Sequence, residues 1–298
     1  GMIPNGIAWP GIALFMRRNL FRLIEWFSNT NGSTTGYKMK IVIATPEIHF
    51  HSPMVLRNLF ERWKNDGDRQ FSVVATPKIS KNKKSSASIG KILKDTGFNY
   101  LARMAFHKLK YDRACKRERK RHIAREERSY LGVQEVCALY QVPFRVFERI
   151  NSLECRKHLK SEKPDFLVSM FFNQIVKKKA LRIPSKACIN LHPSWLPEYK
   201  GMSPILWMLA EDAKEGGATI HVMNEKVDEG ALIGRKRFPI TPQDTFFSLY
   251  RKASSAGADL LNDFLGKGEV DEGNLIETDP DSKYYAPMPK KVFAEVAR

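Results

Sequence analysis

The hydrophobic pattern of the chain alternates short, mainly apolar runs with stretches of helical spacing. Runs of the first kind occupy residues 40–45, 71–76 and 164–170. Such runs are typical of strands in a parallel sheet that is covered on both faces. Residues 54–63 have the spacing of a helix, with Ser52 as the expected N-cap and Pro53 in the first turn. The succession of strand, helix and strand predicts the start of a doubly wound α/β sheet.

The same alternation continues through the second half of the chain. Strands are expected at residues 144–147, 187–191 and 218–223, and helices at 151–159, 177–181 and 202–209. A longer helix is expected from Thr241, as N-cap, and Pro242 toward Leu265. These elements predict an α/β fold over residues 38–266, a Rossmann-like, open, mostly parallel sheet with helices on both faces. A dinucleotide site is not expected, because no GxGxxG sequence follows the first strand.

Three segments add to this predicted core, one of them as an insertion within it. Residues 1–37 predict an N-terminal helical extension and linker, residues 78–130 a basic helical insertion, and residues 267–298 a C-terminal tail. In residues 7–27 the arginines follow the apolar run, unlike in a signal peptide, and the uncharged part is too short to span a bilayer. This segment is read either as a helix packed on the protein or on a second subunit of a homodimer, or as a helix at a membrane surface.

Charge narrows the class of partner. The chain carries a formal net charge of +18, and residues 103–128 hold eleven Lys or Arg residues against four Asp or Glu. A surplus of this kind favours an anionic partner, namely nucleic acid, an acidic membrane surface or a phosphorylated substrate. A solvated helical face is the alternative reading of residues 103–128.

The cysteines indicate the compartment. Cys115, Cys137, Cys155 and Cys188 are scattered without CxxC spacing. This argues against a zinc site and against a disulfide framework, and it favours a reducing environment. We therefore expect a cytoplasmic protein, with peripheral contact at the inner membrane face as the alternative.

The most informative stretch is NLHPSWLPEYKG, which begins at Asn190 and ends at Gly201. Asn190 and His192 are two residues apart on an extended segment, so their side chains point to the same side. The prolines that follow hold the chain away from helix and sheet. The motif thus places an amide and an imidazole together at the end of a strand, where open α/β sheets bind ligands. Downstream, a strand leads into an acidic loop that carries Asp228.

Together with the downstream sequence GATIHVMNEKVDEG, this motif resembles the folate-dependent formyltransferases, which include glycinamide-ribonucleotide, methionyl-tRNA and amino-sugar formyltransferases. The resemblance is strong over residues 160–240 and does not cover residues 1–37. It implies the formyltransferase fold, catalytic roles for Asn190, His192 and Asp228, and N10-formyltetrahydrofolate as co-substrate. It also implies a pterin slot with contacts from Asn173, Gln174, Ile175, Val176, Met223, Glu225 and Val227.

The chemistry of formyl transfer suits these residue types. Negative charge develops on the formyl oxygen when an amine attacks, and the amide of Asn190 is a suitable donor to that oxygen. The imidazole of His192 can donate to the same oxygen or move the proton. A carboxylate beside the ring orients it and raises its pKa, and Asp228 fits that role.

Acceptor contacts are expected at two places. The loop after the first strand offers His49, His51 and Ser52, and the motif itself offers Ser194, Tyr199 and Gly201. The HxH pair is a metal-ligand pattern, but no third ligand stands nearby in the sequence, so no metal is expected. The pair either lines the acceptor pocket or simply lies in a loop. Thr219 and His221 precede the acidic loop and are expected to support the site, with a role in the core as the alternative for His221.

The leading functional hypothesis is therefore formyl transfer to a primary amine on a small anionic acceptor, such as a nucleotide-linked amino sugar. Methionyl-tRNA is the next acceptor, with nucleic acid as partner, and a lipid-linked amine stays open. A formyltetrahydrofolate hydrolase with the same Asn, His and Asp is a second enzyme class. A basic binding protein on this scaffold, without catalysis, is the third reading.

Overall fold

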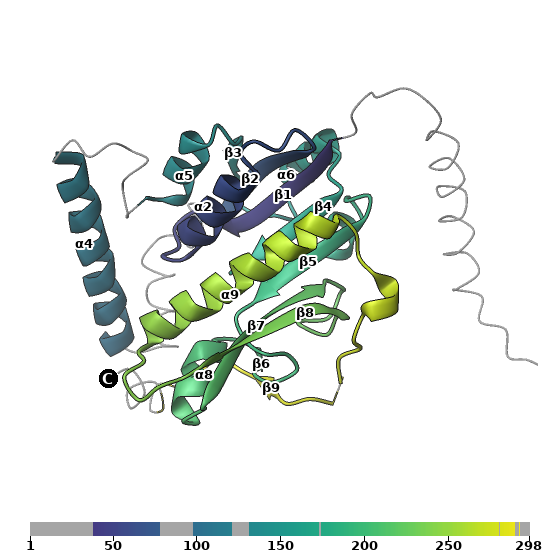
Figure 1. Cartoon of the computed structure of the whole chain (residues 1–298). Coiled ribbons are helices and arrows are strands. Elements are labelled where there is room, and N and C mark those ends of the chain that lie inside the picture. Colours follow the sequence, from purple (N-terminus) through teal and green to yellow (C-terminus); the bar gives the residue numbers. More distant parts are fainter. Residues whose placement is uncertain are drawn as a thin grey trace, which may run out of the picture. The chain divides into compact units, whose positions relative to one another are not determined.

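A seven-stranded sheet forms the centre of the computed structural model, which describes residues 38–77, 98–120, 131–172, 174–279, 281–289 and 292 (Figure 1). The strand order is β3-β2-β1-β4-β5-β7-β8. The strands are β1 Met39–Pro46, β2 Arg69–Thr76, β3 Phe144–Val146, β4 Phe166–Met170, β5 Ala187–His192, β7 Glu215–Val222 and β8 Leu232–Pro239. The first five are parallel, whereas β7 and β8 are antiparallel to their neighbours. The Rossmann-like, mostly parallel sheet predicted from the sequence is confirmed.

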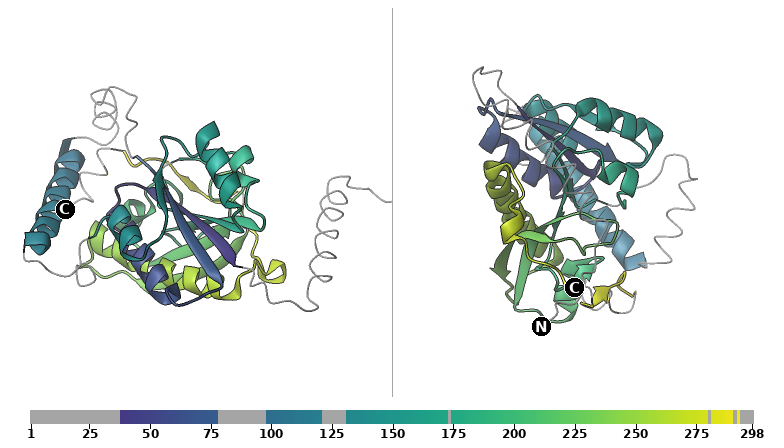
Figure 2. Two further views of the ribbon diagram at one scale, coloured as in Figure 1. Left: turned by 90° about the horizontal axis from the view of Figure 1, so that it is seen from above. Right: turned by 90° about the vertical axis from the view of Figure 1, so that its right-hand side faces the viewer.

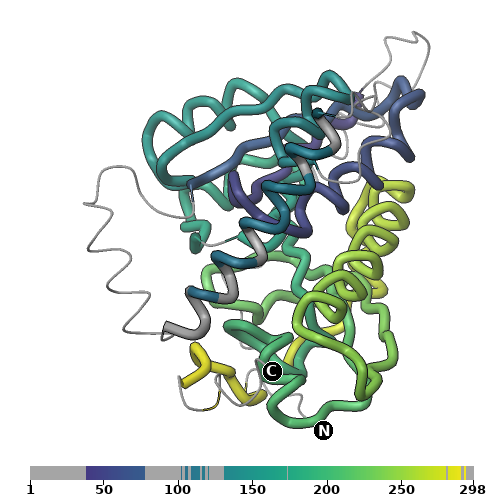
Figure 3. Tube along the Cα trace, turned by 90° about the vertical axis from the view of Figure 1, so that its left-hand side faces the viewer, coloured from purple at the N-terminus to yellow at the C-terminus, as the bar shows by residue number. Residues whose placement is uncertain are grey.

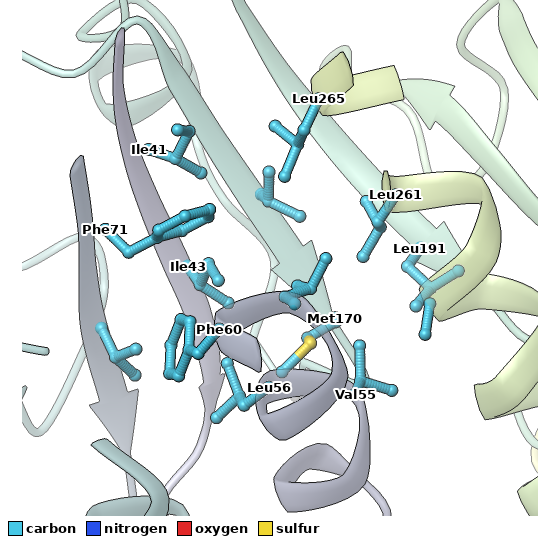
Figure 4. Close-up of a cluster of buried hydrophobic side chains, with 14 of the residues drawn as sticks. Ile41, Ile43, Val55, Leu56, Phe60, Phe71, Met170, Leu191, Leu261 and Leu265 are labelled. Atoms are coloured by element: carbon cyan, nitrogen blue, oxygen red, sulfur yellow. The ribbon is translucent and has the colours of Figure 1, made fainter. Parts of the chain in front are cut away.

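One face of the sheet is covered by α2 (Ser52–Trp63), α5 (Val133–Leu139) and α9 (Phe246–Lys267). Apolar side chains of these helices pack with those of β1, β2, β4 and β5, as Figure 4 shows for Leu56, Phe60 and Leu261. Helices α2 and α9 lie side by side (Figure 3), and Trp63 Nε1 donates to Asn262 Oδ1 at 3.0 Å between them.

The opposite face carries α6 (Leu153–Glu162) and α7 (Lys178–Leu181), so the sheet lies between two helical layers (Figure 2). A second hydrophobic core lies on this face. It is formed by the side chains of β1 and β4 that alternate with those of the first core. Val42, Ala44 and Leu167 pack there against Cys155 and Leu159 of α6. This alternation is the period of two that a strand imposes, here with both faces apolar.

Smaller elements complete the described fold. Helix α8 (Pro204–Ala210) packs on α9 through Ile205 and Met208. A two-stranded sheet joins β6 (Lys200–Gly201) to β9 (Tyr284–Tyr285), and a 3-10 helix covers Glu272–Asn274. The C-terminal tail expected over residues 267–298 therefore contributes a strand beside the motif.

Two helix starts differ from the sequence prediction. Helix α2 includes Ser52, and its N-cap is His51. The Ser52 hydroxyl instead accepts a hydrogen bond from Thr45 Oγ1 at 2.7 Å. Helix α9 begins four residues later than expected, with Thr245 as N-cap in a capping box with Ser248, because Thr241 N–H donates to the Asp244 side chain and forms a separate turn.

The described part of the basic stretch lies in helix α4 (Phe98–Lys120), as its spacing predicts. The N-terminal extension of residues 1–37 and the rest of the basic insertion lie outside the described residues. In the part of the chain that is described, no helix combines the length and the apolar character needed to cross a membrane.

Candidate active site

The pairing of β5 with β7 brings four polar side chains to one face of the sheet. Asn190 lies opposite His221, and His192 lies opposite Thr219, in an antiparallel ladder. Residues directly opposite in such a ladder have their side chains on the same side. The chain then leaves β7 and returns through the acidic loop, which places Asp228 against the same group.

Asp228 links the amide and the imidazole that the motif supplies. Its Oδ2 lies 3.5 Å from His192 Nδ1, and its Oδ1 lies 3.5 Å from Asn190 Nδ2. His221 Nε2 is 3.1 Å from Asn190 Nδ2 and 3.6 Å from Asp228 Oδ1. The three residues that the resemblance assigns to catalysis thus form one connected cluster, although they come from separate parts of the chain.

Hydrogen bonds define the orientation of the two imidazoles. His221 Nδ1 donates to Val222 O at 3.0 Å, so its Nε2 accepts from the Asn190 amide. His192 has acceptors on both sides, because Nδ1 faces Asp228 and Nε2 lies 3.3 Å from Tyr199 O. A protonated His192 ring would donate in both directions, and this arrangement is suited to receiving a proton.

Burial sets the protonation state of the site at rest. Burial lowers the pKa of His192, and it outweighs the Asp228 carboxylate, which acts in the opposite direction. The carboxylate does act to raise the His192 pKa, as expected from the sequence, but the net shift is downward. Burial opposes ionisation of Asp228, but His192, His221 and the Gly201 N–H together bring its pKa below the usual value. An ionised carboxylate therefore stands beside a neutral imidazole at neutral pH.

Ser194 and Thr219 shape the loop that follows His192. Thr219 Oγ1 donates to Ser194 O at 2.6 Å and accepts from Leu196 N at 3.0 Å. Ser194 Oγ donates to Glu198 O at 2.8 Å, and its side chain is buried. The supporting role expected for Thr219 has a direct structural basis, whereas Ser194 uses its hydroxyl within the loop.

The acidic loop is held by close backbone packing. Asp228 adopts a left-handed conformation with φ of 54°. Two residues later, a Cβ atom on Gly230 would lie 1.6 Å from Val222 O, so no larger residue fits there without a shift of the loop. This close approach fixes where the acidic loop, which carries the Asp228 carboxylate, packs against the end of β7.

Two segments expected to form the pterin slot lie next to each other. Lys178 Nζ, just after the first segment, is 3.2 Å from Glu225 Oε1 in the second. Ile175 and Val227 expose 64% and 40% of their surface, and such apolar surface fits the walls of an apolar slot. Val176 is buried in the core below, and Met223 packs on the same core.

Gln174, a polar residue of the first segment, makes its hydrogen bonds to the backbone of a neighbouring segment. Gln174 Oε1 accepts from Ile150 N at 2.9 Å, and its Nε2 donates to Glu148 O at 3.1 Å. Gln174 therefore holds the segment in position. Asn173 lies outside the described residues.

His49, His51 and Ser52 form a separate cluster on the α2 and α9 side of the sheet. His49 Nδ1 accepts from Ser52 N at 3.1 Å, and its ring stacks on Phe171 with the centroids 4.7 Å apart. The His51 ring stacks on Tyr250 at 4.9 Å, and its buried Nε2 has no hydrogen-bond partner among the described residues. Burial, with a smaller effect of Arg251, lowers the His51 pKa to about 4. Among the described side chains, no group of His, Cys, Asp and Glu is arranged to hold a metal ion.

Sequence reasoning missed the role of Lys200 and Glu229. The Lys200 side chain is 3% exposed, and its Nζ lies 3.3 Å from Glu229 Oε1. The pair ties the end of the NLHPSWLPEYKG motif to the acidic loop. The available signal was the position of both residues inside the two motifs, directly beside Tyr199 and Asp228.

Comparison with known proteins identifies what the chain is similar to. The family model described as Formyl transferase matches residues 115–265. The methionyl-tRNA formyltransferase of Thermotoga maritima is 34% identical over 159 residues, which are 53% of this chain and 51% of that protein. The chain thus spans about half the length of the methionyl-tRNA formyltransferases that it matches.

Solved structures show the same fold. The phosphoribosylglycinamide formyltransferase of Anaplasma phagocytophilum superimposes with a TM-score of 0.53 at 16% identity, covering 83% of this chain and 96% of that one. The N-formyltransferase from Helicobacter canadensis, in complex with folinic acid and dTDP-3-aminofucose, gives 0.51 at 19% identity, covering 83% and 70%.

Proposed function

The chain belongs to the formyl transferase family, and we propose that it transfers a formyl group from N10-formyltetrahydrofolate to a primary amine. The observation that carries this proposal is the cluster of Asn190, His192 and Asp228 at the end of β5. Its parts are an amide, a neutral buried imidazole and an ionised carboxylate. Amine acylation needs a donor for the oxyanion and a base for the amine proton, and these groups supply both.

The roles follow from the positions. The folate supplies the formyl carbon as the electrophile that the amine nitrogen attacks. His192 takes the amine proton, and the resulting cation donates to Asp228 and to Tyr199 O. The same proton then passes to the folate nitrogen, whose bond to the formyl carbon breaks. Proton transfer by a placed imidazole typically contributes about 10²–10⁴-fold to the rate.

Asn190 is the proposed oxyanion donor. In the structure its two N–H bonds point to His221 Nε2 and Asp228 Oδ1, at 3.1 and 3.5 Å. The longer of these bonds is the one that the formyl oxygen can replace, because it is the weaker by length. His221 keeps the amide oriented while that exchange occurs.

The acceptor that we favour is an amine on a small anionic molecule, such as a nucleotide-linked amino sugar. The net charge of +18 supports an anionic acceptor. The Helicobacter canadensis protein of the same fold was solved with dTDP-3-aminofucose, a compound of this class.

A methionyl-tRNA acceptor is the second candidate. It is favoured by the identity of 34% with the Thermotoga maritima methionyl-tRNA formyltransferase over 159 residues. Helix α4 is also basic, with Lys110, Arg113, Lys116 and Arg117 along its second half.

An acceptor panel tests the proposal. The full chain is incubated with 10-formyltetrahydrofolate and either a set of nucleotide amino sugars, charged methionyl-tRNA or no acceptor, and release of tetrahydrofolate is followed. Release that depends on an amino sugar supports the favoured acceptor, and release with tRNA alone supports the second candidate. Equal release without acceptor would identify a hydrolase and overturn the transferase proposal.

A further inference from the structure

The C-terminal strand β9 lies directly against the segment that contacts the His192–Asp228 pair. β9 pairs with β6, with Lys200 opposite Tyr284 and Gly201 opposite Tyr285. Met202 N–H continues the ladder by donating to Tyr285 O at 2.8 Å. A segment of the tail is therefore joined by backbone hydrogen bonds to the end of the NLHPSWLPEYKG motif.

Each residue of the Tyr199–Gly201 segment also touches the other side of the site. Tyr199 O lies 3.3 Å from His192 Nε2, and Gly201 N–H donates to Asp228 Oδ2 at 3.2 Å. Lys200 Nζ reaches Glu229, the neighbour of Asp228, at 3.3 Å. The position of this segment thus sets the position of both members of the catalytic pair.

Tyr285 fixes the segment from the opposite side. Its buried ring lies 5.1 Å from the ring of Tyr199 and 5.3 Å from that of Trp207. Its hydroxyl donates to Glu211 Oε2 at 3.0 Å, while Lys283 Nζ donates to Glu211 Oε1 at 3.1 Å. Glu211 follows α8, so the strand is tied to a helix that packs on the body of the protein.

Tyr199 and Asp228 adopt left-handed backbone conformations, which non-glycine residues do not favour on their own. Tyr199 and Asp228 have φ of 58° and 54°, and Gly201 has φ of 113°. Left-handed conformations of residues other than glycine persist when the surroundings impose them. A Cβ on Gly201 would lie 2.5 Å from Tyr285 O, which shows how closely β9 presses on the segment.

We propose that Tyr285 is a positioning residue, which acts through the Tyr199–Gly201 segment to hold His192 and Asp228 at their working separation. The inference rests on the proposed function for its kinetic consequence, but the positional claim stands independently of the substrate. Tyr285 itself makes no step of the reaction. Its effect is expected in turnover, since displacement of reacting groups by about 1 Å can cost on the order of 10²-fold.

The experiment compares Tyr285→Ala and Tyr285→Phe with Tyr140→Ala and Tyr140→Phe in the full chain. Tyr140 is a matched control, because its hydroxyl also donates to a glutamate, Glu61 Oε2 at 2.7 Å, in α2. For each variant we would measure kcat and KM for 10-formyltetrahydrofolate, the thermal midpoint, and hydrogen exchange at the Gly201 and Met202 amides by NMR. The Leu191 amide in β5 serves as the internal reference.

The expected result for Tyr285→Ala is a fall in kcat of roughly 10- to 100-fold with KM changed less than about twofold. Exchange at Gly201 and Met202 should accelerate while Leu191 stays protected. Tyr285→Phe should recover most of the turnover, and the Tyr140 variants should match the wild type in kcat. Unchanged exchange at Gly201 and Met202 would overturn the proposal, and so would a loss of turnover that merely tracks the thermal midpoint. Because the exchange readout needs no acceptor, an enzyme inactive on every acceptor leaves this test decisive.

Discussion

The amide nitrogen of Asn190 lies 3.1 Å from Nε2 of His221, directly across the β5–β7 ladder. His221 is itself fixed, because its other ring nitrogen donates to Val222 O. The oxyanion donor that we propose is thus oriented by a histidine that does not need to touch the substrate. This relationship gives His221 and Asn190 different expected effects when they are replaced.

Replacing Asn190 should remove the donor, whereas replacing His221 should only loosen it. Asn190→Ala is expected to lower kcat by on the order of 10²–10³, the typical effect of losing one oxyanion donor. His221→Phe leaves the amide present without its acceptor, and a loss of roughly tenfold is expected. Steady-state kinetics on both variants, with circular dichroism to verify folding, gives the comparison. A larger loss for His221→Phe than for Asn190→Ala would contradict these roles.

The pH profile should report the buried imidazole. Because burial lowers the pKa of His192 and the neutral ring accepts the amine proton, the acid limb of kcat/KM should have its midpoint below pH 6.5. Asp228→Asn removes a carboxylate that acts to raise the His192 pKa, so the limb should move to lower pH while the plateau falls. Profiles of both proteins between about pH 5 and 9 test this. Movement of the limb to higher pH in the variant would show that another group titrates.

Gly230 should be far less tolerant of a side chain than Gly67. A Cβ on Gly230 would meet Val222 O at 1.6 Å, whereas a Cβ on Gly67 meets no atom within 4 Å. Gly230→Ala should therefore displace the acidic loop, lower the free energy of unfolding by more than about 2 kcal/mol and abolish most turnover. Gly67→Ala is expected to leave both unchanged. Urea unfolding and initial rates measure the contrast, and equal behaviour of the two variants would refute the close packing of the loop.

His51 should make the protein less stable in mild acid. The unfolded ring has a pKa of 6.5 and the folded ring about 4, so the unfolded state binds more protons between these values. The contribution is fully present above pH 6.5 and is lost as the pH falls toward 4, a change of about 3 kcal/mol for a shift of this size. His51→Phe keeps a ring against Tyr250 and should flatten the dependence.

His49→Phe is the matched comparison for that variant. It removes the acceptor of the Ser52 N–H and should lower the free energy of unfolding by about 1–3 kcal/mol at neutral pH. Urea unfolding between about pH 4.5 and 7.5 separates the two effects. A pH dependence in His51→Phe equal to that of the wild type would show that His51 is not its source.

The sequence was sufficient to place the main strands and to bring Asn190, His192 and Asp228 together, for identifiable reasons. The strands are unbroken apolar runs, and Asn190, His192 and Asp228 sit in two motifs whose spacing is specific. The starts of α2 and α9 were misplaced because Ser52 and Thr241 use their polar groups in tertiary or local turn contacts rather than as caps. The supporting contacts of Tyr285 depend on a tail that returns to the site, and no local pattern reveals such a return.

The charge state of His192 could also not be predicted from the sequence. The neighbouring carboxylate was foreseen, but burial of the ring outweighs its effect on the pKa. Burial is a property of the whole fold, in which Tyr199 O, seven residues further along the chain, lies 3.3 Å from the His192 ring.

The most direct test of the central claim follows an isotope-labelled formyl group from 10-formyltetrahydrofolate to the amine of an acceptor by mass spectrometry, in the wild type and in His192→Asn. The account predicts labelled N-formyl product in the wild type and a rate lower by on the order of 10²–10⁴ in the variant, with folate binding retained. Labelled free formate as the product, or equal rates in the two proteins, would contradict it.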